Sequence, residues 1–349
     1  MIMRLKSLFE LIKRMNMDGI IITSYPNVFY FSKFTSEDCI LFINKEKAYL
    51  ITDSRYTLQA KKQAKGFDVI IRKSTYLEEL KKLVNGGKIL FEESISYATY
   101  SSFNKGLDAI LVSTNIDEMR NIKENEEILQ IKKACKIADN CYTHILKFVK
   151  SGMREIEIAN EMNRYMKEIG ASKESFEMIV ASGKRGALPH GVASNKRIRD
   201  GEFVTIDYGC VYKGYCSDIT RSFCLGKPNY EMKKIYNIVK KAQLLAIKSI
   251  KAGIRAYEVD KVARDYIESR GYGKYFVHST GHGLGIEVHD PISVNRNSNT
   301  VLEENMVITV EPGIYIPGKG GIRIEDDVLV TKDGYKVLTK ATKKLVSIE

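Results

Sequence analysis

The chain has 349 residues, of which 44% are hydrophobic and 28% are charged. This length exceeds one ordinary core, so we expect two domains of a soluble globular protein. No apolar run approaches the 18 residues that a membrane span needs, so we predict no membrane partner. The six cysteines lack paired CxxC spacing, and free thiols indicate a reducing, cytoplasmic location.

The formal net charge of +12 raises the possibility of a nucleic acid partner. The basic residues are dispersed and alternate with glutamate, as in LEELKKL, and no basic stripe carries interleaved aromatic residues. We therefore predict a solvated basic surface and no nucleic acid partner.

Residues 1 to about 114 alternate between helix and strand patterns. Leu5, Leu8 and Ile12 recur at helical spacing, and charged residues interrupt them, which predicts an amphipathic helix and not a signal peptide. Asp53 stands where it would cap the next helix. The pattern predicts a mixed-sheet α/β domain with strands at 19–23, 39–43, 48–52, 68–71, 88–92 and 109–112, and helices from about 54, at 76–84 and near 97–104.

The polar segment 115–125 ends this domain, so we place the two domains at 1–121 and 122–349. A long helix from about 124 to 149 opens the second domain, which contains an internal repeat: SGMREIEI at 151–158 resembles AGIRAYEV at 252–259. In each half a long helix precedes this motif, and a second helix, a histidine near a proline and an acidic hairpin follow it. The repeat predicts an α+β fold of duplicated helix–helix–hairpin units with a cleft between the hairpins.

The two hairpins carry four carboxylates, Asp207 and Asp218 in the first and Glu311 and Glu325 in the second. If the first turn is centred on residues 212–213, Asp207 lies directly across from Asp218; if the second loop is centred on Gly318, Glu311 faces Glu325. Carboxylates this close repel one another unless cations neutralise them. With His282 they form an oxygen-rich site that suits two divalent ions, Mn²⁺ first and Co²⁺, Fe²⁺ or Zn²⁺ as alternatives.

The chain contains only five histidines. His144 lies in a helix without a motif, so we expect a structural role. The glycines of HSTGHG argue against a helix there, and His278 is not expected to be a metal ligand. His190, His278 and His289 lie in loops near the acidic hairpins and are candidates for proton transfer and oxyanion stabilisation.

The segments ASGKRGALPHGVAS, STGHGLGIEVHD, VEPGIY and GIRIED together resemble the pita-bread metallopeptidases, the group of methionine aminopeptidase, aminopeptidase P and prolidase. The N-terminal part resembles the creatinase-type domain. The resemblance implies that five residues bind two metal ions, with Asp218 and Glu325 bridging and Glu311 also taking a proton from water. It implies that His190 and His289 stabilise the tetrahedral intermediate, that His278 lines a proline pocket, and that Arg323 and Tyr315 surround the substrate. The implied metal ligands are Asp207, Asp218, His282, Glu311 and Glu325.

These residues predict an aminopeptidase P-like enzyme that hydrolyses the Xaa-Pro bond at the N-terminus of peptides. The alternative within the enzyme class is an Xaa-Pro dipeptidase (prolidase). Methionine aminopeptidase lacks the extra N-terminal domain, and creatine amidinohydrolase lacks this ligand set. A non-catalytic peptide-binding scaffold is a more distant alternative. The family also implies a homodimer.

Overall fold

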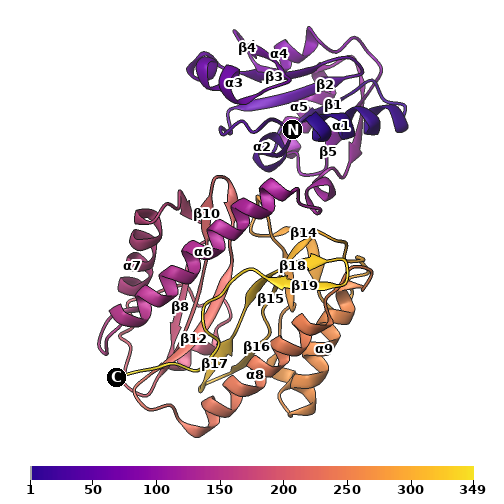
Figure 1. Ribbon diagram of the computed structural model, residues 1–349. Coiled ribbons are helices and arrows are strands. Elements are labelled where there is room, and N and C mark those ends of the chain that lie inside the picture. The colour runs from indigo at the N-terminus through magenta and orange to yellow at the C-terminus, as the bar shows by residue number, and fades with distance from the viewer. Residues whose placement is uncertain (1) are drawn as a thin grey trace. The chain divides into compact units, whose positions relative to one another are not determined.

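The computed structural model describes residues 2–349, and the chain divides into two compact units (Figure 1). The first unit ends at Arg120 and the second begins at Asn121, one residue before the predicted boundary. Across residues 2–349, none of the helices has both the length and the apolar character that a membrane span requires.

The N-terminal unit is built on one six-stranded mixed sheet with the order β4-β3-β2-β1-β5-β6. Strands β1, β2 and β3 are antiparallel neighbours, and the other pairs are parallel. Its core includes Ile21, Phe42 and Leu80. The strands are β1 (Gly19–Ile22), β2 (Cys39–Asn44), β3 (Ala48–Thr52), β4 (Asp68–Ile71), β5 (Lys88–Glu92) and β6 (Ile110–Thr114). The helices are α1 (Ile2–Arg14), α2 (Tyr25–Ser32), α3 (Thr57–Gln63), α4 (Tyr76–Lys81) and α5 (Tyr97–Gly106), with short 3-10 helices η1 (Ser54–Tyr56) and η2 (Asp117–Arg120).

Helix α2 was not predicted from the sequence. Its last six residues are all buried, so the segment lacks the polar face that produces a helical periodicity. The carboxylate of Glu92 accepts hydrogen bonds from the backbone N–H groups of Thr23 and Ser24 just before the helix. The predicted cap is present: the side chain of Asp53 accepts from the backbone N–H of Arg55 at 2.9 Å.

The C-terminal unit consists of two similar halves. The second helices of the halves, α7 and α9, both have 14 residues and are separated by the 101 residues that separate the repeated motifs. The helices are α6 (Asn125–Phe148), α7 (Glu155–Glu168), α8 (Tyr230–Ser249) and α9 (Ala256–Ser269), with 3-10 helices η3 (Gly183–Ala187) and η4 (Gly273–Tyr275). Figure 1 shows α6 and α7 beside the strands of the first half and α8 and α9 beside those of the second. The predicted pita-bread fold is confirmed.

The strands of the C-terminal unit form two main sheets, β20-β12-β9-β8 and β14-β13-β15-β18-β19. The first half contributes β7 (Lys173–Glu174), β8 (Ile179–Ser182), β9 (Phe203–Tyr208), β10 (Cys210–Tyr212), β11 (Tyr215–Cys216) and β12 (Ile219–Leu225). The second half contributes β13 (Gly281–Gly283), β14 (Asp290–Val294), β15 (Val307–Val310), β16 (Gly313–Ile316), β17 (Gly320–Arg323), β18 (Asp326–Thr331), β19 (Gly334–Val337) and β20 (Ser347–Ile348).

The predicted register of the first hairpin is wrong: the turn is centred one residue later than predicted, so each cross-strand partner lies two residues further along. Tyr212 pairs with Tyr215, and Asp207 therefore lies opposite Thr220 instead of Asp218. The cause is the turn: Lys213 and Gly214 both have positive φ, of 48° and 84°, as a two-residue type I′ hairpin requires. A turn centred one residue later shifts every cross-strand partner along the hairpin.

The predicted register of the second hairpin is confirmed. Gly313 pairs with Arg323 in the β16–β17 ladder, and Val310 pairs with Asp326 in the β15–β18 ladder. Both ladders keep one register across the unpaired break between them. Glu311 and Glu325 occupy that break at matching positions, so they face each other as predicted.

Candidate metal centre

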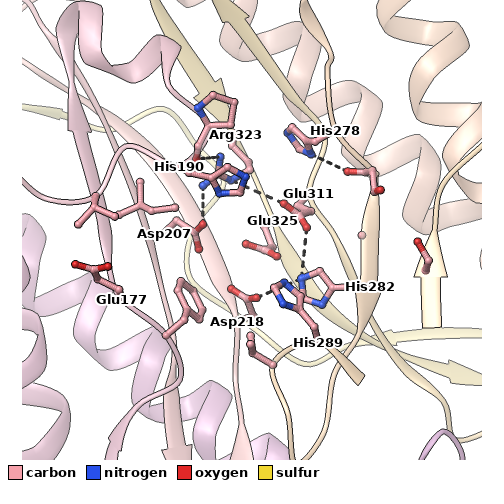
Figure 2. Close-up of a pocket in the computed structure, with 18 residues that line it drawn as sticks. Glu177, His190, Asp207, Asp218, His278, His282, His289, Glu311, Arg323 and Glu325 are labelled. Carbon is pink, nitrogen blue, oxygen red and sulfur yellow. Dashed lines mark hydrogen bonds and ion pairs between the residues drawn. The ribbon is translucent and has the colours of Figure 1, made fainter. Parts of the chain in front are cut away.

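A cavity of about 510 Å³ lies between the strands of the two halves. Every predicted site residue lines it except Tyr315, which contacts two of the lining side chains. Figure 2 shows the carboxylates at the centre with the histidines around them. The predicted residues in the lining are His190, Asp207, Asp218, His278, His282, His289, Glu311, Arg323 and Glu325.

The carboxylates and His282 point at a common space. His282 Nε2 lies 3.6 Å from Asp218 Oδ2 and 3.5 Å from Glu311 Oε1, which is longer than a good hydrogen bond. Ligand atoms of Asp218, His282 and Glu325 all lie within 4.8 Å of one another. This spacing leaves room for an ion between the groups.

The imidazole of His282 is held in the form that can bind a metal. Its Nδ1 lies 3.0 Å from the carbonyl oxygen of Gly283, and only a protonated Nδ1 can donate to that acceptor. Burial lowers the pKa of His282 to about 4, so the ring is neutral at pH 7 and Nε2 keeps its lone pair. A Cβ at Gly281 would lie 2.0 Å from Thr309 O, so glycine is needed for β13 to approach β15.

The acids repel one another in this structure. Burial raises the pKa of Asp218 well above its usual value, and Glu325 raises it further. Burial and the neighbouring Glu311 likewise raise the pKa of Glu325. Burial raises the pKa of Glu311 to about 8, against the opposing influence of Arg323. A cation between the carboxylates would remove this repulsion.

The residues present fit divalent metal ions. Asp207 Oδ1 and Asp218 Oδ1 are buried and have no hydrogen-bond partner among residues 2–349, although a buried charged oxygen without a partner is costly. Both orphan atoms belong to predicted ligands that line the cavity. The remaining oxygens are positioned by neighbours: Asp207 Oδ2 accepts from Arg323 Nη2 at 2.6 Å, and Glu325 Oε2 accepts from Thr220 Oγ1 at 2.6 Å.

A chain of hydrogen bonds fixes His278. Arg323 Nη1 donates to the hydroxyl oxygen of Tyr315 at 2.7 Å, and that hydroxyl lies 2.8 Å from His278 Nε2. His278 Nδ1 lies 2.7 Å from the carbonyl oxygen of Ser279, so Nδ1 carries the proton and Nε2 accepts from Tyr315. Burial lowers the pKa of His278 to about 4. Both ring nitrogens are occupied, which agrees with the prediction that His278 is not a ligand and leaves no free nitrogen for proton transfer.

Of the other three histidines, two line the cavity and one lies away from it, as predicted. His190 and His289 line the cavity, and the ring of His289 meets that of His282 edge to face with centroids 4.2 Å apart. His144 lies away from the cavity in α6, where its Nε2 is 2.6 Å from Glu161 Oε1 and its ring stacks on Tyr165.

Several residues that line the cavity were not predicted from the sequence. Phe176, Glu177 and Ile179 contribute one wall, and Figure 2 shows Glu177 on the far side of Asp207 from His278. Glu177 and Ile179 are two residues apart in an extended segment that leads into β8, so strand alternation could have indicated that pair; it could not have indicated Phe176. Val192, Val288 and Ser293 also line the cavity, and no local pattern marks them.

Two family models together match nearly the whole chain. Residues 129–332 match metallopeptidase family M24, and residues 4–122 match the creatinase/prolidase N-terminal domain. The chain belongs to metallopeptidase family M24, and its N-terminal unit is a creatinase/prolidase N-terminal domain.

Relatives of known structure match over the full length. An Xaa-Pro dipeptidase from Bacillus anthracis is 44% identical with a TM-score of 0.96 and 99% of each chain covered. An Xaa-Pro dipeptidase of Pyrococcus horikoshii is 41% identical over 98% of each chain. An X-Pro aminopeptidase from Thermotoga maritima is 38% identical with a TM-score of 0.91, covering 96% of this chain and 99% of that one. The first two matches favour the dipeptidase alternative over the aminopeptidase P-like prediction.

Proposed function

We propose that this protein is a metal-dependent Xaa-Pro dipeptidase. The observation that carries the proposal is the convergence of four carboxylates and His282 on one cavity, with two buried carboxylate oxygens that lack partners. The names of the dipeptidase relatives supply the substrate class. Proline forms a tertiary amide whose rigid ring offers a shape to recognise.

Asp207, Asp218, His282, Glu311 and Glu325 would hold two divalent ions. When bound, such ions supply Lewis acidity and make water acidic enough to give a nucleophile at neutral pH. The oxygen-rich donor set favours Mn²⁺. Elemental analysis of protein reconstituted with Mn²⁺, Co²⁺, Zn²⁺ or Fe²⁺ tests this assignment: two bound ions per chain are expected, and one ion or fewer with all four metals would contradict it.

The chain's own residues handle the proton and the oxyanion. Glu311 takes a proton from the attacking water and delivers it to the proline nitrogen as the C–N bond breaks. His190 and His289, which line the cavity, would donate to the carbonyl oxygen as negative charge develops on it. The His278 ring, whose nitrogens are both occupied, presents its carbon edge to the proline ring.

Substrate length distinguishes the dipeptidase from the aminopeptidase. The Thermotoga maritima relative is named an X-Pro aminopeptidase, so that activity is the second candidate. The test compares kcat/KM for Leu-Pro with that for Leu-Pro-Gly and longer peptides. We expect Leu-Pro to be preferred; a higher value for the longer peptides would replace the dipeptidase proposal with the aminopeptidase one.

The homodimer is proposed from the family resemblance alone. Sedimentation analysis of the purified full-length chain tests it, and a monomer at micromolar concentration would contradict it.

A further inference from the structure

Helix α9 carries a buried ion pair that the proposed chemistry does not use. Arg264 Nε donates to Asp260 Oδ2 at 2.8 Å, and Arg264 Nη2 donates to Asp260 Oδ1 at 2.7 Å. Asp260 is 1% exposed, and the side chain of Arg264 is 11% exposed. Removing two charges from water is costly, so a pair this deep needs further partners to be tolerated.

Those partners all belong to the segment that carries His278. Arg264 Nη1 donates to the carbonyl oxygen of Phe276 at 3.1 Å, and Nη2 donates to that of His278 at 2.9 Å. The guanidinium carbon lies 4.1 Å from the centre of the Phe276 ring. Asp260 Oδ1 also accepts from Thr280 Oγ1 at 2.8 Å. The pair therefore ties residues 276–280 to α9 at three points.

The tied segment depends on these anchors. Residues 276–280 belong to no helix or strand, so no continuous backbone ladder holds them. The segment also leads into the candidate metal centre, because the carbonyl oxygen of Thr280 accepts from the backbone N–H of Glu311 at 2.7 Å. On its other side, the His278 ring meets Tyr315. A displacement of the segment would move the His278 ring relative to the cavity.

We propose that Asp260 and Arg264 are positioning residues that set the place of the His278 ring and thereby the preference for proline after the cleaved bond. The inference rests on the proposed Xaa-Pro peptidase function. Neither residue lines the 510 Å³ cavity, so both act through His278 and not on the substrate. Arg264 contacts Phe276 and His278 but not Thr280, whose carbonyl oxygen holds Glu311. The loss of Arg264 should therefore change the fit of the proline ring, and the effect should appear mainly in KM.

A second cavity makes the pair accessible from the other side. This cavity of about 470 Å³ is lined by Asp260 and Arg264, together with Lys261 and six other residues. If Arg264 is shortened to alanine, a guanidinium ion can enter from this cavity and take the place of the missing group. Lys261 provides a matched control, because it lies on the same helix and forms an exposed ion pair with Asp265.

The experiment measures kcat and KM for Leu-Pro and Leu-Ala in the wild type and in Arg264→Ala, Arg264→Lys and Lys261→Ala. In Arg264→Ala we expect the ratio of kcat/KM for Leu-Pro over Leu-Ala to fall by about 10- to 100-fold, mainly through KM for Leu-Pro. Millimolar guanidinium should restore part of the ratio, whereas the same concentration of sodium should not. Lysine keeps the charge but cannot donate to both carbonyls and both carboxylate oxygens, so Arg264→Lys should be intermediate.

A purely structural role predicts a different result. Loss of folded protein lowers the apparent kcat for both dipeptides equally and leaves KM and the Leu-Pro to Leu-Ala ratio of kcat/KM unchanged. That outcome in Arg264→Ala overturns the inference. If Arg264→Ala does not fold, the same outcome in Arg264→Lys overturns it. If the wild type cleaves neither dipeptide, the proposed function fails instead. The ¹⁵N resonances of the His278 ring then decide the positioning role without catalysis: an unchanged tautomer pattern in the variants overturns it.

Discussion

Each half of the C-terminal unit holds its histidine-bearing loop to a helix through a buried acid and an arginine, but the two halves take these residues from different elements. In the first half, Glu155 at the start of α7 is fully buried and accepts hydrogen bonds from the loop that leads to and from His190. The donors are Ser182, Arg185 and Ser194. In the second half, α9 supplies both the acid and the arginine, and the loop supplies carbonyl groups.

The acids do not occupy equivalent positions. Glu155 corresponds to Ala256 by the spacing of the repeat, and Asp260 corresponds to Ala159, one helical turn further on. In both halves a loop is therefore held to the second helix, but the residues that hold it stand at different positions of the repeat. We call the contacts of Glu155 and those of the Asp260–Arg264 pair the two loop clamps. A repeat in the sequence can indicate the architecture of both halves, but it does not reveal these loop clamps.

The largest expected effect concerns Glu311, which belongs to the second hairpin. Glu311→Ala removes the proposed proton acceptor as well as a metal ligand, so kcat for Leu-Pro should fall by about 100- to 10,000-fold. Steady-state kinetics at saturating metal measure it. Glu304→Ala, an exposed acid before the same strand, should leave kcat unchanged. A near-normal rate in Glu311→Ala would remove the proposed mechanism.

The loop clamps can be compared through stability. Glu155→Ala leaves the Arg185 guanidinium without its carboxylate partner, and Asp260→Ala does the same to Arg264. Asp260→Ala should lower the free energy of unfolding by about 3–5 kcal/mol, because the Arg264 side chain is only 11% exposed and would be left an uncompensated charge. Glu155→Ala should lower it by about 1–3 kcal/mol, because the backbone N–H of the buried Ser182 loses its acceptor, whereas Arg185 is 27% exposed and can be hydrated. Urea unfolding monitored by circular dichroism measures both.

An exposed acid on α7 serves as the control for the clamps. Glu168→Ala breaks a surface pair with Arg164 and should cost at most about 1 kcal/mol. A loss at Glu155 or Asp260 no larger than that of the control would mean that the corresponding clamp does not hold its loop.

Metal binding should stabilise both halves together, because the proposed ligands come from both hairpins. At a free Mn²⁺ concentration about 100-fold above Kd, the stabilisation should be about 2.7 kcal/mol. Thermal unfolding with and without a chelator measures it. Asp218→Asn in the first half and Glu325→Gln in the second should each abolish most of the gain; a full gain in either variant would argue against a shared site.

The smallest expected effect concerns the turn that sets the first register. Lys213 has a left-handed backbone conformation that asparagine adopts more readily than lysine. Lys213→Asn should stabilise the protein by about 0.5–1 kcal/mol. Lys213→Ala, which retains the strain, should show no gain in the same unfolding assay. Equal stability of the two variants would mean that the turn is not strained at this residue.

Much of the fold followed from local patterns. The strands at 68–71 and 88–92 have the predicted bounds, and the repeat indicated the duplicated helices and hairpins. Helix α2 did not follow from such a pattern, because its last six residues are all buried, so the segment shows no alternation of buried and exposed faces to detect. The predicted site residues gather around one cavity, although Phe176 and Glu177 were missed.

The acidic and histidine residues, their order and their assignment to two hairpins could be derived from the chain alone, since strand alternation and repeat spacing are local properties. The structure decided which residues face each other across the first hairpin, because the backbone angles of Lys213 and Gly214 move the centre of the turn by one residue and each cross-strand partner by two. It also decided the tautomers of His278 and His282 and the clamp on α9. These depend on carbonyl and carboxylate groups that packing brings together from distant parts of the chain.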